Sequence, residues 1–214
     1  MNHIIKIAVI GGTGKSGKYL VQQLIAQGFP IKLLIRNTDT FQITHPLIEV
    51  IPGNVTDYNT VQRLVEGCNG VISTLGMGIP ASEPTIFSES TTHVIQAMQA
   101  FNVHRYIVTT GLNVDTPFDH KTGKTAMATD WMKSTYPVST ANKQQEYEIL
   151  ANSPVDWTLV RLPKIEQTDE CSQVTVSLTD CRGDKISATS LAYFLIEQLS
   201  IREYIKKSPF IANV

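Results

Sequence analysis

Several features that would assign this chain to a specialised class of protein are scarce. The 214 residues include three cysteines, an odd number without metal-ligand spacing, so we expect reduced thiols. The histidines are scattered, with no pair at metal-ligand spacing, and we expect no bound metal. The net charge of -1 leaves no electrostatic footprint for nucleic acid or for an anionic membrane.

Long apolar runs are also missing. No stretch approaches the length of a membrane-spanning helix, and the N-terminus enters an apolar strand without the pattern of a signal peptide. With the reduced cysteines, these absences predict a cytoplasmic protein without a membrane or nucleic-acid partner. We expect a single domain over residues 1–214 and make no prediction of oligomeric state.

What the sequence does contain is an alternation of β-branched apolar runs and helical patterns, which is typical of parallel βαβ units. The predicted fold class is α/β, a single Rossmann-like, doubly wound domain with a mostly parallel sheet of about seven strands. We expect strands at 4–10, 30–36, 47–51, 70–74, 105–110, 155–162 and 174–178, a short apolar end at 210–211, and helices at 18–27, 57–66, 84–101, 137–151 and 190–199.

A glycine cluster separates the first strand from the first helix. Three of its glycines fit the dinucleotide fingerprint G-x-G-x-x-G, in which they make a tight turn, admit a pyrophosphate and let the helix pack closely. The helix N-terminus then offers N–H groups and a positive dipole end to phosphates. The expected cofactor-binding turn is Gly11, Gly12, Thr13, Gly14, Lys15, Ser16 and Gly17.

The same turn contains Gly14-Lys15-Ser16, which matches the end of a P-loop. That motif needs a glycine five positions before Gly14, where Val9 stands inside the strand. We therefore favour a dinucleotide site over a P-loop.

The end of the second strand bears on the choice of cofactor. NAD-binding chains place an acid there for the ribose 2′-OH, whereas NADP-binding chains place a basic residue for the 2′-phosphate. Arg36 stands at this strand end and can face a phosphate with its planar donor fork, while Asp39 is a displaced candidate acid. The sequence favours NADP (NADPH) over NAD.

The turns after the next strands fall where one extended ligand would lie. Asn54 and Val55 are expected beside the adenine ring, and the turn after the fourth strand beside the ribose and diphosphate. The fifth strand ends at Thr109-Thr110-Gly111, near the expected nicotinamide. The further cofactor-binding candidates are Asn54, Val55, Thr74, Leu75 and Gly76.

Residues 113–136 lose the periodic pattern. We expect a lid-like loop there, because long loops in compact domains are usually functional or disordered, and this one follows a strand end. Met127, Trp131 and Met132 can offer apolar faces to a planar ring. A mobile insertion without a role is the alternative.

With these residues in place, the chain resembles the atypical short-chain dehydrogenase/reductase superfamily, within it the NAD(P)-binding, NmrA-like group that includes the flavin/biliverdin reductases. The glycine turn is similar to that group's G-A-T-G-x-T-G, Arg36 to its strand-end arginine, and residues 53–55 to its G-D-V. Residues 174–187 look like the group's closing hairpin. The resemblance implies NADPH across the sheet's top and reduction of a flat acceptor.

The chain departs from the superfamily at its usual catalytic pair, Tyr-x-x-x-Lys. None of the seven tyrosines has a lysine four residues later. The remaining catalytic candidates are Thr110, at the fifth strand's end, and Lys143, where related chains often have a K-x-x-x-E-like helix and this chain has K-x-x-E. Pro163, which fixes φ in the turn after the next strand, is expected near the nicotinamide.

Three functions stay open on these grounds. The first is an NADPH-dependent oxidoreductase that transfers hydride to a flat conjugated acceptor such as a flavin or quinone, which needs no protein acid because its proton can come from water. The second is a non-catalytic NADP(H)-sensing regulator of the NmrA-like type, favoured by the missing tyrosine. The third is a sugar-nucleotide epimerase or dehydratase, disfavoured because those enzymes use that tyrosine.

Overall fold

The computed structural model describes residues 5–41, 43–78 and 81–213, and its centre is one eight-stranded sheet. The strand order is β3-β2-β1-β4-β5-β6-β10-β8, so the chain moves one way from β1 and the other way from β4. This reversal is the topological switch point at which open α/β sheets bind ligands. The strands are β1 (Ile7–Ile10), β2 (Ile31–Ile35), β3 (Ile48–Pro52), β4 (Gly70–Ser73), β5 (Arg105–Gly111), β6 (Asp156–Leu162), β8 (Val174–Ser177) and β10 (Phe210–Asn213).

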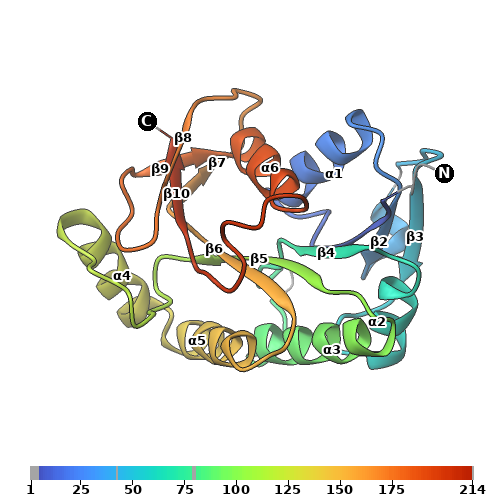
Figure 1. Ribbon diagram of the computed structural model, residues 1–214, viewed down its shortest axis with the longest axis horizontal. Helices are drawn as coiled ribbons and strands as arrows, with labels where there is room; N and C mark the ends of the chain where they lie inside the picture. Colours follow the sequence, from blue (N-terminus) through green and yellow to red (C-terminus); the bar gives the residue numbers. More distant parts are fainter. Residues whose placement is uncertain (1–4, 42, 79–80, 214) are drawn as a thin grey trace.

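Helices cover both faces of the sheet (Figure 1). Two helices, α1 and α6, pack together on one face, while α2, α3 and α5 cover the other. Helix α4 stands at one end of the molecule, beside α5 (Figure 1). The helices are α1 (Gly17–Ala26), α2 (Tyr58–Val65), α3 (Ile86–Ala100), α4 (Gly123–Thr135), α5 (Pro137–Ala151) and α6 (Ala188–Glu197), with a 3-10 turn η1 (Thr38–Thr40).

The first strand explains why both faces are covered. All four residues of β1 are buried, and successive side chains enter opposite layers. Ala8 and Ile10 join the core beneath α2, α3 and α5, while Ile7 and Val9 join the core beneath α1 and α6. A continuous β-branched run is therefore the expected pattern for this strand, because neither face of a parallel sheet meets water.

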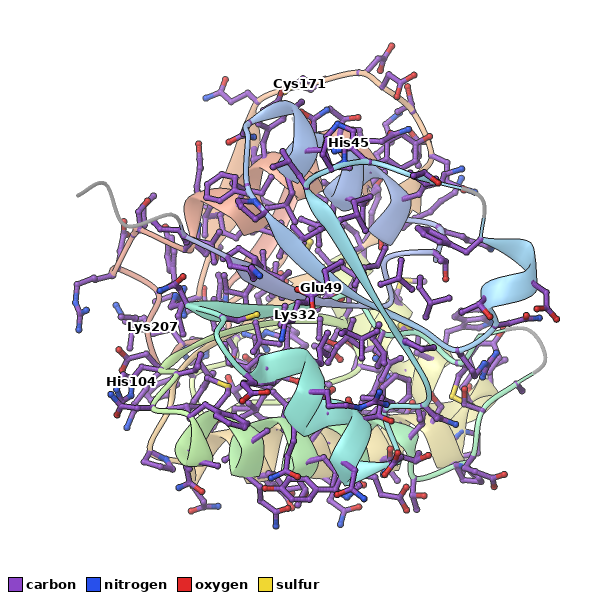
Figure 2. All side chains as sticks on the ribbon, turned by 90° about the vertical axis from the view of Figure 1, so that its right-hand side faces the viewer. Lys32, His45, Glu49, His104, Cys171 and Lys207 are labelled. Atoms are coloured by element: carbon purple, nitrogen blue, oxygen red, sulfur yellow. The ribbon has the colours of Figure 1, made fainter. Side chains whose placement is uncertain are left out.

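A buried charge fixes α2 to the sheet. The Nζ of Lys32, in β2, donates hydrogen bonds of 2.8 Å to the carbonyls of Arg63 and Glu66 at the C-terminus of α2. Glu49 of β3 lies 3.9 Å from the same Nζ, and Figure 2 shows these two labelled side chains next to each other. The ammonium satisfies carbonyls that the end of the helix leaves open.

The α/β prediction is confirmed, with a few corrections. Seven strands are parallel neighbours, and β8 adds an eighth, antiparallel to β10. The expected hairpin over 174–187 is wrong: β9 (Lys185–Ser187) instead pairs in parallel with β7 (Lys164–Glu166). Strand β8 pairs with β10, in antiparallel orientation, at the edge of the main sheet. The first strand was expected from Ile4, which lies outside the described residues.

The prediction of a loop over 113–136 is wrong for its second half, which forms α4. This helix buries only Thr125 and Thr129, while Met127 and Trp131 are exposed. Because no apolar stripe faces the core, the sequence carries no helical periodicity there. Within the described ranges, no helix combines the length and the apolar character needed to cross a bilayer.

Candidate functional site

One large cavity, of about 1420 Å³, opens along the carboxyl ends of the strands on both sides of the switch point. Its lining includes fourteen of the sixteen predicted site residues. They are Gly11, Thr13, Gly14, Lys15, Ser16, Arg36, Asn54, Val55, Thr74, Leu75, Gly76, Thr110, Lys143 and Pro163. Gly12 and Gly17 are absent from the lining, because they pack inside the turn.

The glycine turn needs its glycines for three separate reasons. Gly11 has a φ of +76°, and a Cβ there would lie 2.7 Å from the carbonyl of Thr74 at the end of β4. A Cβ on Gly12 would strike the side chains of Leu33 and Val21, and one on Gly17 would strike the backbone of Gly11. These contacts hold β1, α1 and β4 in close packing.

Two other glycines present bare backbone to the cavity. A Cβ on Gly14 would touch only the carbonyl oxygen of Gly11, at 3.1 Å, and one on Gly76 would touch nothing within 4 Å. Both residues line the cavity, and the N-terminus of α1 begins directly after Ser16. This open cradle at a helix N-terminus fits a dinucleotide's diphosphate.

The residues expected around the adenosine end lie together on the adjoining wall. The Nη1 of Arg36 lies 3.0 Å from the Oγ of Ser82, which it donates to, so the guanidinium is held at the cavity rim. Asn54 accepts a hydrogen bond from the N–H of Thr56 at 3.3 Å, and Val55 is buried beside it. The Asn54 oxygen thus stabilises its own turn through one of its two lone pairs, and its amide NH₂ can donate to a ligand.

The two catalytic candidates meet at the other side of the switch point. The Nζ of Lys143, from α5, lies 3.5 Å from the Oγ1 of Thr110, at the end of β5. The same ammonium sits 3.9 Å from the ring centre of Phe87. Burial lowers the pKa of Lys143 below its ordinary value, and the negative charge of Glu146 partly opposes this. A lowered pKa makes the ammonium a better proton donor.

Glu146 lies outside the cavity lining but interacts with Lys143, and sequence reasoning assigned it no role. It lies one helical turn after Lys143 and is 2% exposed. Its Oε1 accepts a hydrogen bond of 2.9 Å from Thr91, whereas Oε2 has no hydrogen-bond partner among the described residues. Burial raises the pKa of Glu146 to about 7, although the charge of Lys143 lowers it. The K-x-x-E spacing was the available signal, since it places both residues on one helix face.

Helix α4 forms the cavity wall on this side. Its N-terminus is tied to a segment before β9: Thr122 donates to Asp180 from its N–H (3.2 Å) and its hydroxyl (2.7 Å), and Lys124 pairs with Asp184. Trp131 and Met132 line the cavity, whereas Met127 is 73% exposed and does not. Of the three apolar residues expected to meet a planar ring, two therefore lie at the cavity.

A fully buried arginine anchors the segment that leads to α4. Arg161 of β6 contacts both carboxylate oxygens of Asp119, at 2.6 and 2.7 Å, through Nη1. It also donates to the carbonyl of Ser208 at 2.7 Å and lies 3.5 Å from the ring centre of Phe210. Arg161 is absent from the cavity lining, so it supports the wall of the cavity rather than facing a ligand.

In the described part of the chain, no group of three or more His, Cys, Asp or Glu side chains is placed to hold a metal ion. The cysteines are unpaired, with Cys68 buried, Cys171 exposed and Cys181 at the cavity.

Comparison with known proteins identifies relatives of three kinds. The chain is 28% identical over 137 residues to phenylcoumaran benzylic ether reductase 1 of Arabidopsis thaliana, covering 58% of this chain and 41% of the relative. It is 26% identical over 115 residues to photosystem II assembly factor Ycf39 of Trieres chinensis, covering 52% and 36%. A short-chain dehydrogenase/reductase structure from Veillonella parvula, in complex with NADP, has a TM-score of 0.82 at 14% identity, covering 98% and 94%.

The chain spans less than half the length of these two curated relatives. The likeness to the Veillonella structure concerns the fold, which agrees over nearly the whole of both chains. Residues 11–201, from the glycine turn to beyond α6, match a family described as NAD(P)H-binding. This match covers most of the sequence, and the chain belongs to the NAD(P)H-binding family.

Proposed function

We propose that this protein is an NADPH-dependent oxidoreductase that reduces a flat conjugated acceptor such as a flavin or quinone. The observation that carries the proposal is one continuous cavity running from the glycine turn to the Thr110–Lys143 pair. Its first half suits an extended dinucleotide, and its second half has room beside α4 for a second molecule. The proposal is in keeping with a relative that is named a reductase.

The preference for NADPH over NADH rests on Arg36. Its guanidinium stands at the cavity rim after β2, where a 2′-phosphate would be recognised. Planar guanidinium groups bind phosphate oxygens through paired hydrogen bonds. A structural neighbour of the same fold holds NADP, which agrees with this choice.

The chain's own residues would orient the reactants and manage one proton. Bound NADPH would supply the hydride. Thr110 and Lys143 would lie beside the acceptor, where their donors can stabilise negative charge developing on an oxygen or nitrogen atom. For a flavin or quinone the proton can come from water, whereas a carbonyl acceptor would need Lys143 or Thr110 as donor.

A regulatory function is the second candidate. It is favoured by the missing Tyr-x-x-x-Lys pair and by a relative named as an assembly factor rather than an enzyme. In that case the same turn would bind NADP(H), but no acceptor would be reduced. A sugar-nucleotide epimerase or dehydratase is the weakest of the three candidates, because those enzymes use the tyrosine that this chain lacks.

Substitution of Gly14 tests the binding of NADP(H) at the glycine turn, which the reductase and the regulatory candidates share. Gly14→Val would place a side chain in the open cradle, with only the Gly11 carbonyl near its Cβ, so the variant should fold. We expect loss of NADPH binding by fluorescence titration, together with loss of NADPH oxidation in the presence of FMN. A folded variant with unchanged NADPH affinity would place the cofactor elsewhere. NADPH binding without turnover of any flat acceptor, in the unmodified protein, would favour the regulatory candidate.

A further inference from the structure

The cavity is more basic than the protein as a whole. Six of the eight charged side chains that line it are Lys or Arg, although the chain has a net charge of -1. Lys15 and Arg36 lie at the end assigned to the cofactor's phosphates. The other four lie on the opposite side of the switch point and are Lys124, Lys143, Lys164 and Arg182. The cofactor's phosphates therefore do not account for this second group of positive charges.

The two acidic residues of the lining are already engaged. Asp184 pairs with Lys124. Asp180 accepts hydrogen bonds from Thr122 and, at 2.8 Å, from the N–H of Cys181, so its carboxylate holds the start of α4 in place. Neither carboxylate forms an ion pair with Lys164 or Arg182.

Two cations remain with little local neutralisation. Arg182 is exposed and makes no hydrogen bond or ion pair with any other residue that the structure describes. Lys164 has a side chain 77% exposed and lies 4.0 Å from Glu166, whose carboxylate is nearer to Lys185, at 3.0 Å. Such an exposed, long ion pair contributes little.

The fold brings these two cations to neighbouring segments. Lys164 begins β7 and is in register with Lys185 of β9, and Arg182 lies three residues before Lys185. Figure 1 shows β7 and β9 side by side at the end of the molecule that also carries α4. Lys164 and Arg182 therefore border the half of the cavity in which the acceptor is proposed to lie.

We propose that Arg182 and Lys164 bind an anionic group on the acceptor, so that the substrate class is a planar molecule bearing a phosphate or a carboxylate. The proposal rests on the proposed function for the position of the acceptor. A guanidinium fork and an ammonium on the same cavity lining suit such an oxyanion group, because the fork supplies paired hydrogen bonds and the ammonium a point charge. Neutral flat molecules would fill the same space without using these cations.

FMN and riboflavin form a matched pair for the test, because they share a ring system and differ by one phosphate. Their dissociation constants should be measured by quenching of flavin fluorescence on the NADP⁺-loaded protein, at low ionic strength. We expect FMN to bind roughly tenfold more tightly than riboflavin. Arg182→Gln and Lys164→Gln should each weaken FMN roughly threefold to tenfold while leaving riboflavin unchanged.

Lys207→Gln is the matched control, since it removes the same charge at an exposed residue that lies outside the cavity lining and does not contact Glu166. Equal affinity for the two flavins, no binding of FMN, or an equal effect of Lys207→Gln would overturn the proposal. Competition of FMN by anthraquinone-2-carboxylate, compared with competition by inorganic phosphate, which shares only the phosphate with FMN, distinguishes a carboxylate from a phosphate source.

Turnover with NADPH is a separate measurement, so the two proposals fail independently. FMN discrimination without NADPH oxidation would support the anion site and contradict the reductase function. NADPH oxidation with equal affinity for FMN and riboflavin would support the reductase function and contradict the anion site.

Discussion

At the scale of single residues, the same chemical group has different roles according to its surroundings. The guanidinium of Arg36 lies at the rim of the cavity, where it can meet a ligand, whereas that of Arg161 is fully buried and paired with Asp119. Both arginines stand near the end of a strand. The position of an arginine at a strand end therefore suggests that it binds a ligand. Its burial and its hydrogen-bond partners show whether it can do so or instead stabilises the fold.

Replacement of Arg36 tests the choice of cofactor. Arg36→Ala should weaken NADPH binding by about 1.5–3 kcal/mol, the range for hydrogen bonds to a charged group, and should barely affect NADH. Titration of both cofactors measures this. Ser82→Ala is the control, because it removes a partner of Arg36 but retains the guanidinium. An equal loss for NADPH and NADH would exclude recognition of the 2′-phosphate.

Glu146 should make stability depend on pH. Because burial raises its pKa to about 7, the folded protein holds a proton that the unfolded chain releases nearer its ordinary pKa of 4.5. The contribution of Glu146 to the free energy of unfolding is fully present below about pH 4.5. It is lost as pH rises through 7, and the loss is about 3 kcal/mol at most. Glu146→Gln lacks this loss and can still accept from Thr91.

The thermal midpoint of Glu146→Gln, relative to the unmodified protein, should thus rise between pH 5 and pH 8, by roughly 5–10 °C for the full effect. The matched control is Glu148→Gln on the exposed side of α5, which should show no such trend. A pH-independent difference would mean that Glu146 stays charged in the folded protein. The groups that face this carboxyl are Lys143 on its own helix and Tyr106 of β5, through Thr91.

At the scale of elements, α4 forms a wall of the half of the cavity in which the acceptor is proposed to lie. It is held to the segment before β9 by polar contacts and exposes two of its apolar side chains, Met127 and Trp131. Trp131 lines the cavity, is 58% exposed, and meets Tyr136 edge-on at 5.8 Å between ring centres. A side chain this exposed anchors the helix weakly and remains available to a planar ring.

Trp131→Ala should therefore affect the acceptor more than the fold. We expect the apparent KM for FMN to rise roughly threefold to tenfold, the effect of one lost aromatic contact, with NADPH affinity unchanged. The thermal midpoint should change by less than about 2 °C. Met127→Ala, on the same helix but outside the cavity lining, serves as the control. A midpoint lowered by several degrees, with normal acceptor kinetics, would refute the substrate role.

How well the sequence predicted each element depended on the physical signal available. The buried strand β1 was found because both of its faces are covered and its residues form a continuous apolar run. Helix α4 was missed because it buries threonines rather than an apolar stripe. The partner of β8 was missed because strand pairing with β10 joins segments over thirty residues apart, which local pattern does not encode.

The site divides in the same way. The cofactor half was predictable, since its residues follow strand ends in a motif with fixed spacing. The role of Glu146 was not, because its significance depends on an unpartnered buried oxygen and a neighbouring ammonium. Likewise, only the fold brings Arg182 and Lys164 to the lining of one cavity.

At the scale of the whole molecule, Arg161 connects segments that are far apart in the sequence. From β6 it reaches Asp119 before α4, the carbonyl of Leu178 after β8, and the carbonyl of Ser208 before β10. The Arg161 side chain is 0% exposed and that of Asp119 is 11% exposed. Burial lowers the pKa of Arg161, and the hydrogen bonds to Asp119 oppose this. The pair thus offsets the cost of a charge held inside the fold.

Loss of Asp119 should consequently destabilise the entire domain. Asp119→Ala leaves a buried guanidinium without its counter-ion, which typically costs about 3–5 kcal/mol, or a midpoint lowered by roughly 6–20 °C at this chain length. Asp130→Ala removes the same charge from an exposed position on α4 and should shift the midpoint by no more than about 2 °C. Calorimetry at pH 7 compares the two variants. Similar midpoints for both would show that the other acceptors around Arg161 suffice without the carboxylate, and that the wall behind the cavity does not depend on this ion pair.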